Sequence, residues 1–305
     1  MKQASEENLG KLTTEQANPA SYELDLKSAL ELTQIINAED AKIARAVERA
    51  LPDVAQAIDL IAGALREGGR LIYVGAGTSG RIAALDASEC PPTFNTDPKT
   101  VQFLIAGGPK ALLGAVEASE DSSKLGVQEM AKRKPGRKDV VVGIAASGRT
   151  PFTIAAVEYA RKKGAKTVAV VCNPNSRLEK AAEVGIVADV GPEVVSGSTR
   201  MKAGTAQKMI LNMLSTGAMT RLGYVYGNLM VNVHLKNEKL IERGVGVLQK
   251  ITGMTREEAL SALKKSGKRV PVALVMASAK VGRAQAERAL KVHHRNVRLA
   301  IQGFR

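Results

Sequence analysis

The pattern of apolar positions changes character near residue 70. From about residue 21 to residue 66, apolar side chains recur at helical spacing, which predicts helices. The last of these helices is predicted to end at Gly68-Gly69. Its apolar stripe consists of Val54, Ile58, Ile61, Ala62 and Leu65. Residues 1–20 are polar, contain Asn18-Pro19 and are predicted to form an extended arm.

After residue 70, short runs of Val, Ile and Leu alternate with helical patterns. The predicted strands are Leu71–Val74, Val101–Ala106, Val140–Ala145, Thr167–Val171 and Ile186–Val190. The predicted helices between them are Arg81–Ala87, Lys110–Ala118, Ser122–Lys132, Pro151–Lys163 and Arg177–Ala182. Apolar strands separated by helices are typical of βαβ units. We therefore predict an α/β fold with a doubly wound, mostly parallel sheet, whose strand-end loops meet at one ligand-binding edge.

The rest of the chain is predicted to be helical. A long helix from about Thr199 to Leu222 precedes a break at Gly223–Gly227. In the segment after the break, Thr255 and Glu258 have the spacing of a capping box, Pro271 can open a helix, and residues 282–301 predict a last one. We expect an N-terminal arm with helices at 1–53, an α/β domain at 54–235 and a small C-terminal helical module at 236–305.

Composition agrees with a helix-covered sheet. The 305 residues are 45% hydrophobic but only 3% aromatic, so small aliphatic side chains must fill the core. No apolar run reaches the roughly 18 residues that span a bilayer, and the N-terminus lacks the apolar segment of a secretory signal. Cys90 and Cys172 stand far apart, as in proteins of a reducing compartment. These features predict a cytoplasmic protein that does not enter a membrane.

The positive charge is concentrated near the C-terminus. The net charge is +14, and residues 241–305 carry fourteen Lys and Arg against four Asp and Glu. A basic surface of this kind can bind nucleic acid or an acidic partner. It can equally be the solvated face of helices, which we favour because no aromatic stacking platform accompanies the charge. Nucleic acid is therefore not an expected partner.

A glycine turn follows the first predicted strand. Leu71–Val74 stops at Gly75-Ala-Gly-Thr-Ser-Gly80, and a helical segment follows at once. A helix that starts in this way offers unpaired amide groups and partial positive charge to an anion. A dinucleotide would need an acidic residue at the end of the second strand, where the chain has Gly107-Gly108-Pro109 instead. The Lys-Ser/Thr pair of a P-loop is also missing.

Two later strands end in similar loops. Ala146-Ser-Gly-Arg-Thr-Pro151 follows the third strand, and Ser196-Gly-Ser-Thr-Arg200-Met-Lys202 follows the fifth. The hydroxyl groups in these loops could simply cap helices. Three such loops at one sheet edge favour a phosphate monoester. The candidate phosphate-binding residues are Gly77, Thr78, Ser79, Gly80, Arg81, Ser147, Gly148, Arg149, Thr150, Ser196, Ser198, Thr199 and Lys202.

Longer motifs carry a family resemblance. The two loops GAGTSGR and SGRTP, in this βαβ order, resemble the sugar isomerase (SIS) domain, a flavodoxin-like phosphosugar-binding fold. Across nearly the whole chain the sequence is similar to the N-acetylmuramic acid 6-phosphate etherase family. The motifs that carry this similarity are LTTEQANPAS (12–21), VGAGTSGRIAALDASECPPTF (74–94), IAGG (105–108), AVEASED (115–121) and SGSTRMKAGTAQKMILNMLST (196–216).

The resemblance implies a reaction and a site. The family cleaves the D-lactyl ether of N-acetylmuramic acid 6-phosphate in cell-wall sugar recycling, giving N-acetylglucosamine 6-phosphate and D-lactate. It implies Glu89 as proton donor, Glu120 as base, no metal or cofactor, and a homodimer with its site near the subunit interface, to which the helix at 199–222 could contribute. A donor must stay protonated near neutral pH, and we expect Cys90-Pro91-Pro92 to give Glu89 apolar surroundings.

Two other functions remain open at this point. A phosphosugar isomerase would bind the same phosphate and leave the ether intact. A non-catalytic phosphosugar-binding regulator of a protein or gene would bind without turnover. His234, His293 and His294 have no metal-ligand spacing to Cys, Asp or Glu, so no metal site is expected.

Overall fold

The computed structural model describes residues 12–304 except 115, 234 and 236. The first eleven residues of the predicted arm, and His234, lie outside this part. The described chain divides into two compact units. One runs up to Ala87 and continues through Val101–Leu214; the other comprises Ser88–Thr100 and the residues after Leu214. The three-part division at 53 and 235 stays a prediction.

The first unit contains a five-stranded sheet in which every pair is parallel, as the sequence predicts. The strand order is β2-β1-β3-β4-β5, the doubly wound order of flavodoxin-like folds. β5 starts and ends earlier than predicted, and beyond its end the chain turns at Gly191, whose φ is +70°. The strands are β1 (Leu71–Gly75), β2 (Val101–Ile105), β3 (Val140–Ile144), β4 (Lys166–Val171) and β5 (Val184–Val187).

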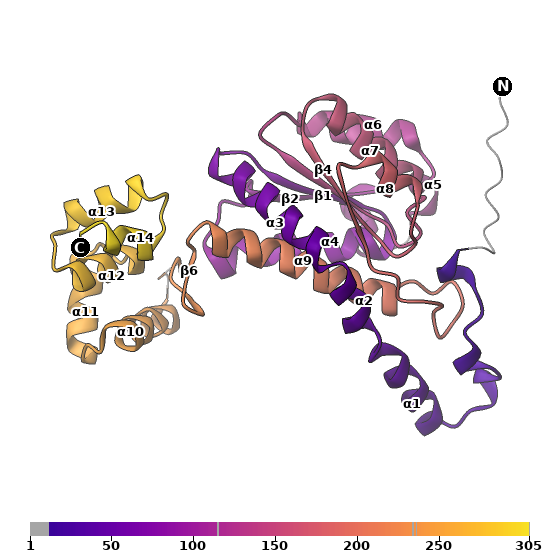
Figure 1. Ribbon diagram of the computed structural model, residues 1–305, viewed down its shortest axis with the longest axis horizontal. Coiled ribbons are helices and arrows are strands. Elements are labelled where there is room, and N and C mark those ends of the chain that lie inside the picture. Colours follow the sequence, from indigo (N-terminus) through magenta and orange to yellow (C-terminus); the bar gives the residue numbers. More distant parts are fainter. Residues whose placement is uncertain (1–11, 115, 234, 236, 305) are drawn as a thin grey trace. The chain divides into compact units, whose positions relative to one another are not determined.

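Helices cover both faces of this sheet (Figure 1). On one face α7 (Pro151–Lys162) and α8 (Arg177–Ala181) pack on the strands, with α6 (Ser123–Arg133) against α7. On the other face α3 (Leu51–Arg66) packs against β1, β3 and β5. The apolar stripe of α3 points inward, since Val54, Ile61 and Ala62 are buried. Continuous apolar strands thus form a core shielded on both sides, as a parallel sheet requires.

The remaining helices of this region differ from their predicted bounds. α4 (Gly77–Phe94) begins earlier and runs further than predicted, and it includes Pro91 and Pro92. The helix expected at 110–118 is instead a 3-10 helix, Gly108–Leu112, and the short α5 (Glu117–Glu120). Gly107 and Gly108, with φ values of +84° and +66°, turn the chain from β2 into this 3-10 helix. The other helices are α1 (Ala29–Asp40), α2 (Ile43–Arg49) and α9 (Lys202–Arg221).

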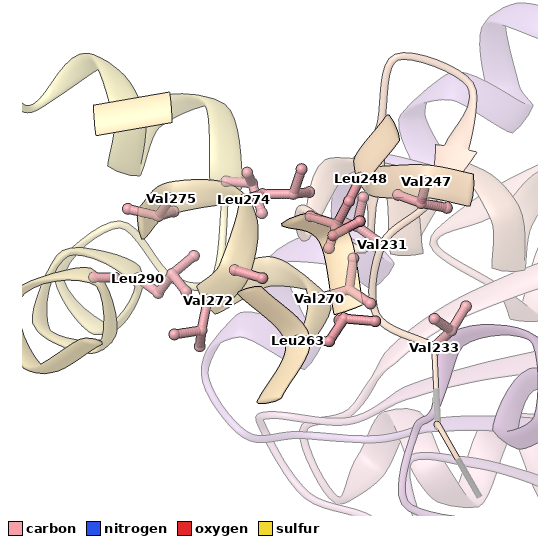
Figure 2. Packing of buried hydrophobic residues seen from close by; sticks show 14 of the residues in the cluster. Val231, Val233, Val247, Leu248, Leu263, Val270, Val272, Leu274, Val275 and Leu290 are labelled. Carbon is pink, nitrogen blue, oxygen red and sulfur yellow. The ribbon is translucent and has the colours of Figure 1, made fainter. Parts of the chain in front are cut away.

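The second unit has its own apolar core among helices (Figure 2). The predicted capping box is present, with Thr255 and Glu258 bonded reciprocally at the start of α11. The single helix predicted at 282–301 is two helices, because His294 and Arg295 adopt positive φ. The elements are β6 (Val225–Tyr226), β7 (Leu229–Met230), α10 (Glu238–Thr252), α11 (Arg256–Lys265), α12 (Val270–Ala279), α13 (Arg283–Val292) and α14 (Val297–Gln302).

Within residues 12–304, apart from the three gaps, none of the helices combines the length and apolarity that crossing a bilayer demands.

Candidate functional site

The strand order places two of the three hydroxyl loops beside each other. β1 pairs with β2 on one side and with β3 on the other, so the direction of winding reverses between β1 and β3. Doubly wound sheets bind ligands at this reversal, beyond the carboxyl ends of the strands. The glycine turn follows β1, and the loop with Ser147 follows β3. Both candidate phosphate loops therefore flank the place where the fold favours a ligand.

Glu120 lies directly against the glycine turn. A β-carbon built on Gly77 would be 3.2 Å from the Glu120 Oε1 atom, and the φ of Gly77 is +51°. Any larger residue would be strained at this position and would press on the carboxyl group. Glycine thus allows α4 to begin beside α5, which carries Glu120 at its last residue. The structure brings together a predicted anion-binding turn and a predicted catalytic carboxylate.

The surroundings of Glu120 favour its protonated form. Burial raises the pKa of this half-buried carboxyl group, and the charges of Asp121 and Glu117 raise it further. Arg81 opposes this shift with its positive charge, and its guanidinium donates a 2.9 Å hydrogen bond to the Gly114 carbonyl oxygen. A carboxylate with a raised pKa accepts a proton more readily once it is ionised. This chemistry suits a general base.

We expect Asp121→Asn to shift the acidic limb of the pH–activity profile to lower pH. Removing the Asp121 charge removes one cause of the raised pKa of Glu120, so Glu120 ionises at lower pH. The measurement is kcat/KM against pH, which reports groups of the unliganded enzyme. Glu129→Gln is the matched control, because Glu129 pairs with Lys132 on α6 and does not contribute to the shift. An unchanged or higher midpoint in Asp121→Asn would contradict this assignment.

The first turn of α4 is held by α9. Ser79 is buried and donates a 3.0 Å hydrogen bond to Gln207 Oε1. Gly204 faces Thr78 and Ile82, since a β-carbon there would meet their side chains at 3.5 and 3.6 Å. The Ser79 hydroxyl group therefore donates its proton to Gln207 and not to a ligand. The Thr78 side chain is half-buried. Gln207 and Gly204 lie within a family motif but were not candidate site residues.

The loop after β3 is pinned to the segment after β4. Gly148 has a φ of +67°, and a β-carbon there would overlap the Ser176 side chain. Its carbonyl oxygen accepts a 2.9 Å hydrogen bond from the Leu178 amide. Within the loop, the Arg149 amide donates to Ser147 Oγ at 3.3 Å, and Thr150 precedes Pro151 at the start of α7. The side chains of Ser147, Arg149 and Thr150 stay half-buried, which leaves them able to reach a ligand.

The third loop contacts the N-terminal arm. Ser196 is exposed and donates a 2.9 Å hydrogen bond to the Glu15 carbonyl oxygen, while Ser198 and Thr199 are half-buried. Binding of phosphate by these hydroxyl groups stays a prediction.

Lys202 belongs to a buried ion pair. Its side chain is 1% exposed, and its ammonium group donates to Glu39 Oε2 on α1 at 2.6 Å. The Glu193 carboxylate accepts from the backbone amides of Lys202 and Ala203 at 3.0 and 2.9 Å, so it caps the start of α9. These contacts favour a structural role for Lys202 over direct contact with phosphate.

Glu89 lies inside α4, not beyond its end. It follows Gly77 by twelve residues, more than three helical turns. Its side chain is exposed, whereas that of the neighbouring Cys90 is buried. The predicted apolar surroundings of Glu89 are therefore absent in the single chain, as far as the described residues show. Among the residues that the structure describes, no group of three or more His, Cys, Asp and Glu side chains forms a candidate metal site.

Comparison with known proteins first defines the class. The model of the glucokinase regulatory protein N-terminal SIS domain matches residues 53–161, and that of the SIS domain matches residues 127–217. A phosphoheptose isomerase from Francisella tularensis shares the fold, with a TM-score of 0.50 and 19% identity over 64% of this chain and all of that one. The sheet and the helices that cover it therefore have the fold of a SIS domain.

Full-length relatives then define the family. An N-acetylmuramic acid 6-phosphate etherase from Photorhabdus laumondii is 50% identical over 98% of this chain and 99% of its own length. Another, from Clostridium beijerinckii, is 51% identical over 92% of both chains. The chain belongs to the N-acetylmuramic acid 6-phosphate etherase family.

Proposed function

We propose that this protein cleaves the D-lactyl ether of N-acetylmuramic acid 6-phosphate, as a carbon–oxygen lyase. The products are N-acetylglucosamine 6-phosphate and D-lactate, and the reaction serves the recycling of cell-wall sugars. Family membership supports the substrate. The observation that carries the chemistry is the Glu120 carboxyl group against Gly77, at the point where the sheet's winding reverses.

Elimination makes cleavage of an ether feasible. In the open-chain sugar the aldehyde acidifies the proton at C2, and a base that removes it lets the lactate oxygen leave from C3. Water then adds at C3 of the unsaturated aldehyde. Glu120 acts as the base, because its raised pKa brings its basicity closer to neutral pH. The amide groups of the glycine turn and the side chains of Ser147, Arg149 and Thr150 bind the phosphate.

A proton donor completes the reaction. The departing lactate oxygen is a poor leaving group as an alkoxide, so a carboxylic acid must protonate it. The family pattern assigns this role to Glu89. No metal or cofactor is needed for either proton transfer.

Release of D-lactate tests the function directly. The purified protein is incubated with N-acetylmuramic acid 6-phosphate, and D-lactate is measured with a lactate dehydrogenase assay. The sugar without its phosphate is the control and should react far more slowly. A phosphosugar isomerase or a non-catalytic binding protein would release no lactate, which would overturn the proposal.

We also propose a cytoplasmic homodimer whose sites are completed by the partner subunit. Three large apolar side chains near the start of α1 are exposed in the single chain: Tyr22 (74%), Leu26 (72%) and Leu30 (67%). Glu89 is exposed as well. A proton donor works best away from bulk water. A second copy of the chain that covers Glu89 would shield its carboxyl group from solvent. By contrast, α9 buries Ile210, Leu211 and Leu214 within its own chain.

Mixed dimers test whether Glu89 acts across the interface. Glu89→Gln and Glu120→Gln chains, each inactive alone, are denatured together and refolded. If Glu89 serves the partner's site, half the sites in each mixed dimer regain both carboxyl groups, and activity recovers to about a quarter of the wild-type value. No recovery, or a monomer in sedimentation equilibrium, would contradict the shared site.

A further inference from the structure

A second group of buried polar contacts surrounds Asn173, at the carboxyl edge of the sheet. Asn173 follows β4 by two residues and is 2% exposed. Its Nδ2 group donates two hydrogen bonds of 3.1 Å, one to Thr14 Oγ1 and one to the carbonyl oxygen of Ala146. Ala146 begins the loop that carries Ser147, Arg149 and Thr150. One side chain thus joins the N-terminal arm to a proposed phosphate loop.

Thr14 extends the connection to the third loop. It is fully buried, and its carbonyl oxygen accepts a 3.2 Å hydrogen bond from the Gly197 amide. The next residue, Glu15, accepts from Ser196 Oγ through its own carbonyl oxygen. The arm therefore lies between two loops that are 50 residues apart in the sequence, and it is bonded to both. Neither loop is fixed to the other by the sheet alone, because β4 and β5 come between them in the chain.

The orientation of the Asn173 carboxamide is determined. Both acceptors face Nδ2, and turning the group over would bring Oδ1 against the Ala146 carbonyl oxygen, another acceptor. In the described part of the chain Oδ1 is buried without a hydrogen-bond partner. A buried unsatisfied oxygen opposes folding. This oxygen therefore adds no stability, and the contribution of the side chain lies in the two hydrogen bonds that its Nδ2 group donates.

We propose that Thr14 and Asn173 are positioning residues, which hold the loops at 147–150 and 196–199 at the spacing that binds the phosphosugar. Neither side chain need touch the substrate. The inference rests on the proposed function, because it uses the same loops. Loss of either side chain should loosen both loops before binding and weaken affinity, while the carboxyl groups that carry the chemistry stay in place.

The test compares Thr14→Val, which keeps the shape of the side chain and removes the acceptor for Asn173, with Thr14→Ser, which restores it. The control is Thr153→Val, since Thr153 is fully buried in α7 and its hydroxyl has no hydrogen-bond partner among the described residues. Steady-state kinetics give kcat and KM for N-acetylmuramic acid 6-phosphate. Calorimetry gives the Kd of N-acetylglucosamine 6-phosphate.

In Thr14→Val we expect KM and Kd to rise about tenfold, the effect of one buried hydrogen bond, with kcat almost unchanged. Thr14→Ser and Thr153→Val should resemble the wild type. Equal KM and Kd in Thr14→Val and Thr153→Val would overturn the inference, as would a loss confined to kcat. If Thr14→Val does not fold, Asn173→Ser must show the same rise, and a wild-type KM and Kd there would overturn it.

The two proposals can fail separately. A wild-type chain that binds N-acetylglucosamine 6-phosphate without releasing lactate would refute the etherase proposal, and the calorimetric comparison would still test Thr14. A wild-type chain that does not bind the phosphosugar would refute both.

Discussion

Glu120→Gln is expected to lower kcat for lactate release by about 10²–10⁴-fold, the usual contribution of a general base. The amide keeps the size of the side chain beside Gly77 but cannot accept the C2 proton. The Kd of N-acetylglucosamine 6-phosphate should stay near the wild-type value, because the phosphate loops are unchanged. Kinetics and calorimetry on the same preparation separate the two effects.

Glu117→Gln is the matched control for this variant. Glu117 lies on the same short helix, is exposed, and affects Glu120 only through its charge. Its loss should preserve most of the activity at neutral pH. Full activity in Glu120→Gln, or an equal loss in Glu117→Gln, would show that the base is elsewhere.

Lys202→Met is expected to destabilise the protein by about 3–5 kcal/mol, because it leaves Glu39 buried without its main partner. The Lys202 ammonium, Lys42 and Asn18 all bond to Glu39 and lower the pKa of its carboxyl group to about 2, against the desolvation that raises it. The ionised pair therefore contributes its full stability above the ordinary pKa of Glu39. This contribution is lost as the pH falls towards 2. Urea unfolding of the wild type and the variant measures the difference.

The double variant Glu39→Met/Lys202→Met separates structure from binding. Replacing both buried charges by apolar side chains should recover much of the stability lost in the single variant. If Lys202 is structural, the double variant binds N-acetylglucosamine 6-phosphate with nearly wild-type affinity. If Lys202 contacts phosphate, the double variant folds but binds weakly, and the assignment made from its buried position is wrong.

Local pattern was enough to predict the sheet and the loops that follow its strands. Apolar runs marked all five strands, and glycine with hydroxyl residues marked the turns after β1 and β3. The parallel direction followed from the helices between strands, and it alone brings these loops to one edge. The bounds of α4 were harder to predict, because proline is disfavoured inside a helix and α4 nevertheless includes Pro91 and Pro92.

Contacts between distant segments could not be predicted in this way. Lys202 was predicted to bind phosphate because it is a cation in the loop after the fifth strand. Its ammonium group instead bonds to Glu39, which lies 163 residues earlier in the sequence. The sequence around Asn173 did not indicate a role for this residue, because its hydrogen bond is made to Thr14 in the distant N-terminal arm. Helix and strand periodicity report which face of an element is buried, but not which polar side chains meet there. Thr14 and Gln207 lie within family motifs, but a motif does not show that Thr14 meets Asn173 or that Gln207 meets Ser79.

The central claim is that the ether is broken by elimination and water addition, with Glu120 removing the C2 proton. The most direct test is to run the reaction in water enriched in ¹⁸O and deuterium and to analyse both products by mass spectrometry. Elimination and addition predict ¹⁸O at C3 and deuterium at C2 of the N-acetylglucosamine 6-phosphate. The lactate should keep the original ether oxygen, without ¹⁸O, and should carry no deuterium on carbon. Heavy oxygen on lactate would mean direct displacement at the lactyl carbon, and ¹⁸O at C3 without deuterium at C2 would mean direct displacement at the sugar; either result would contradict the account.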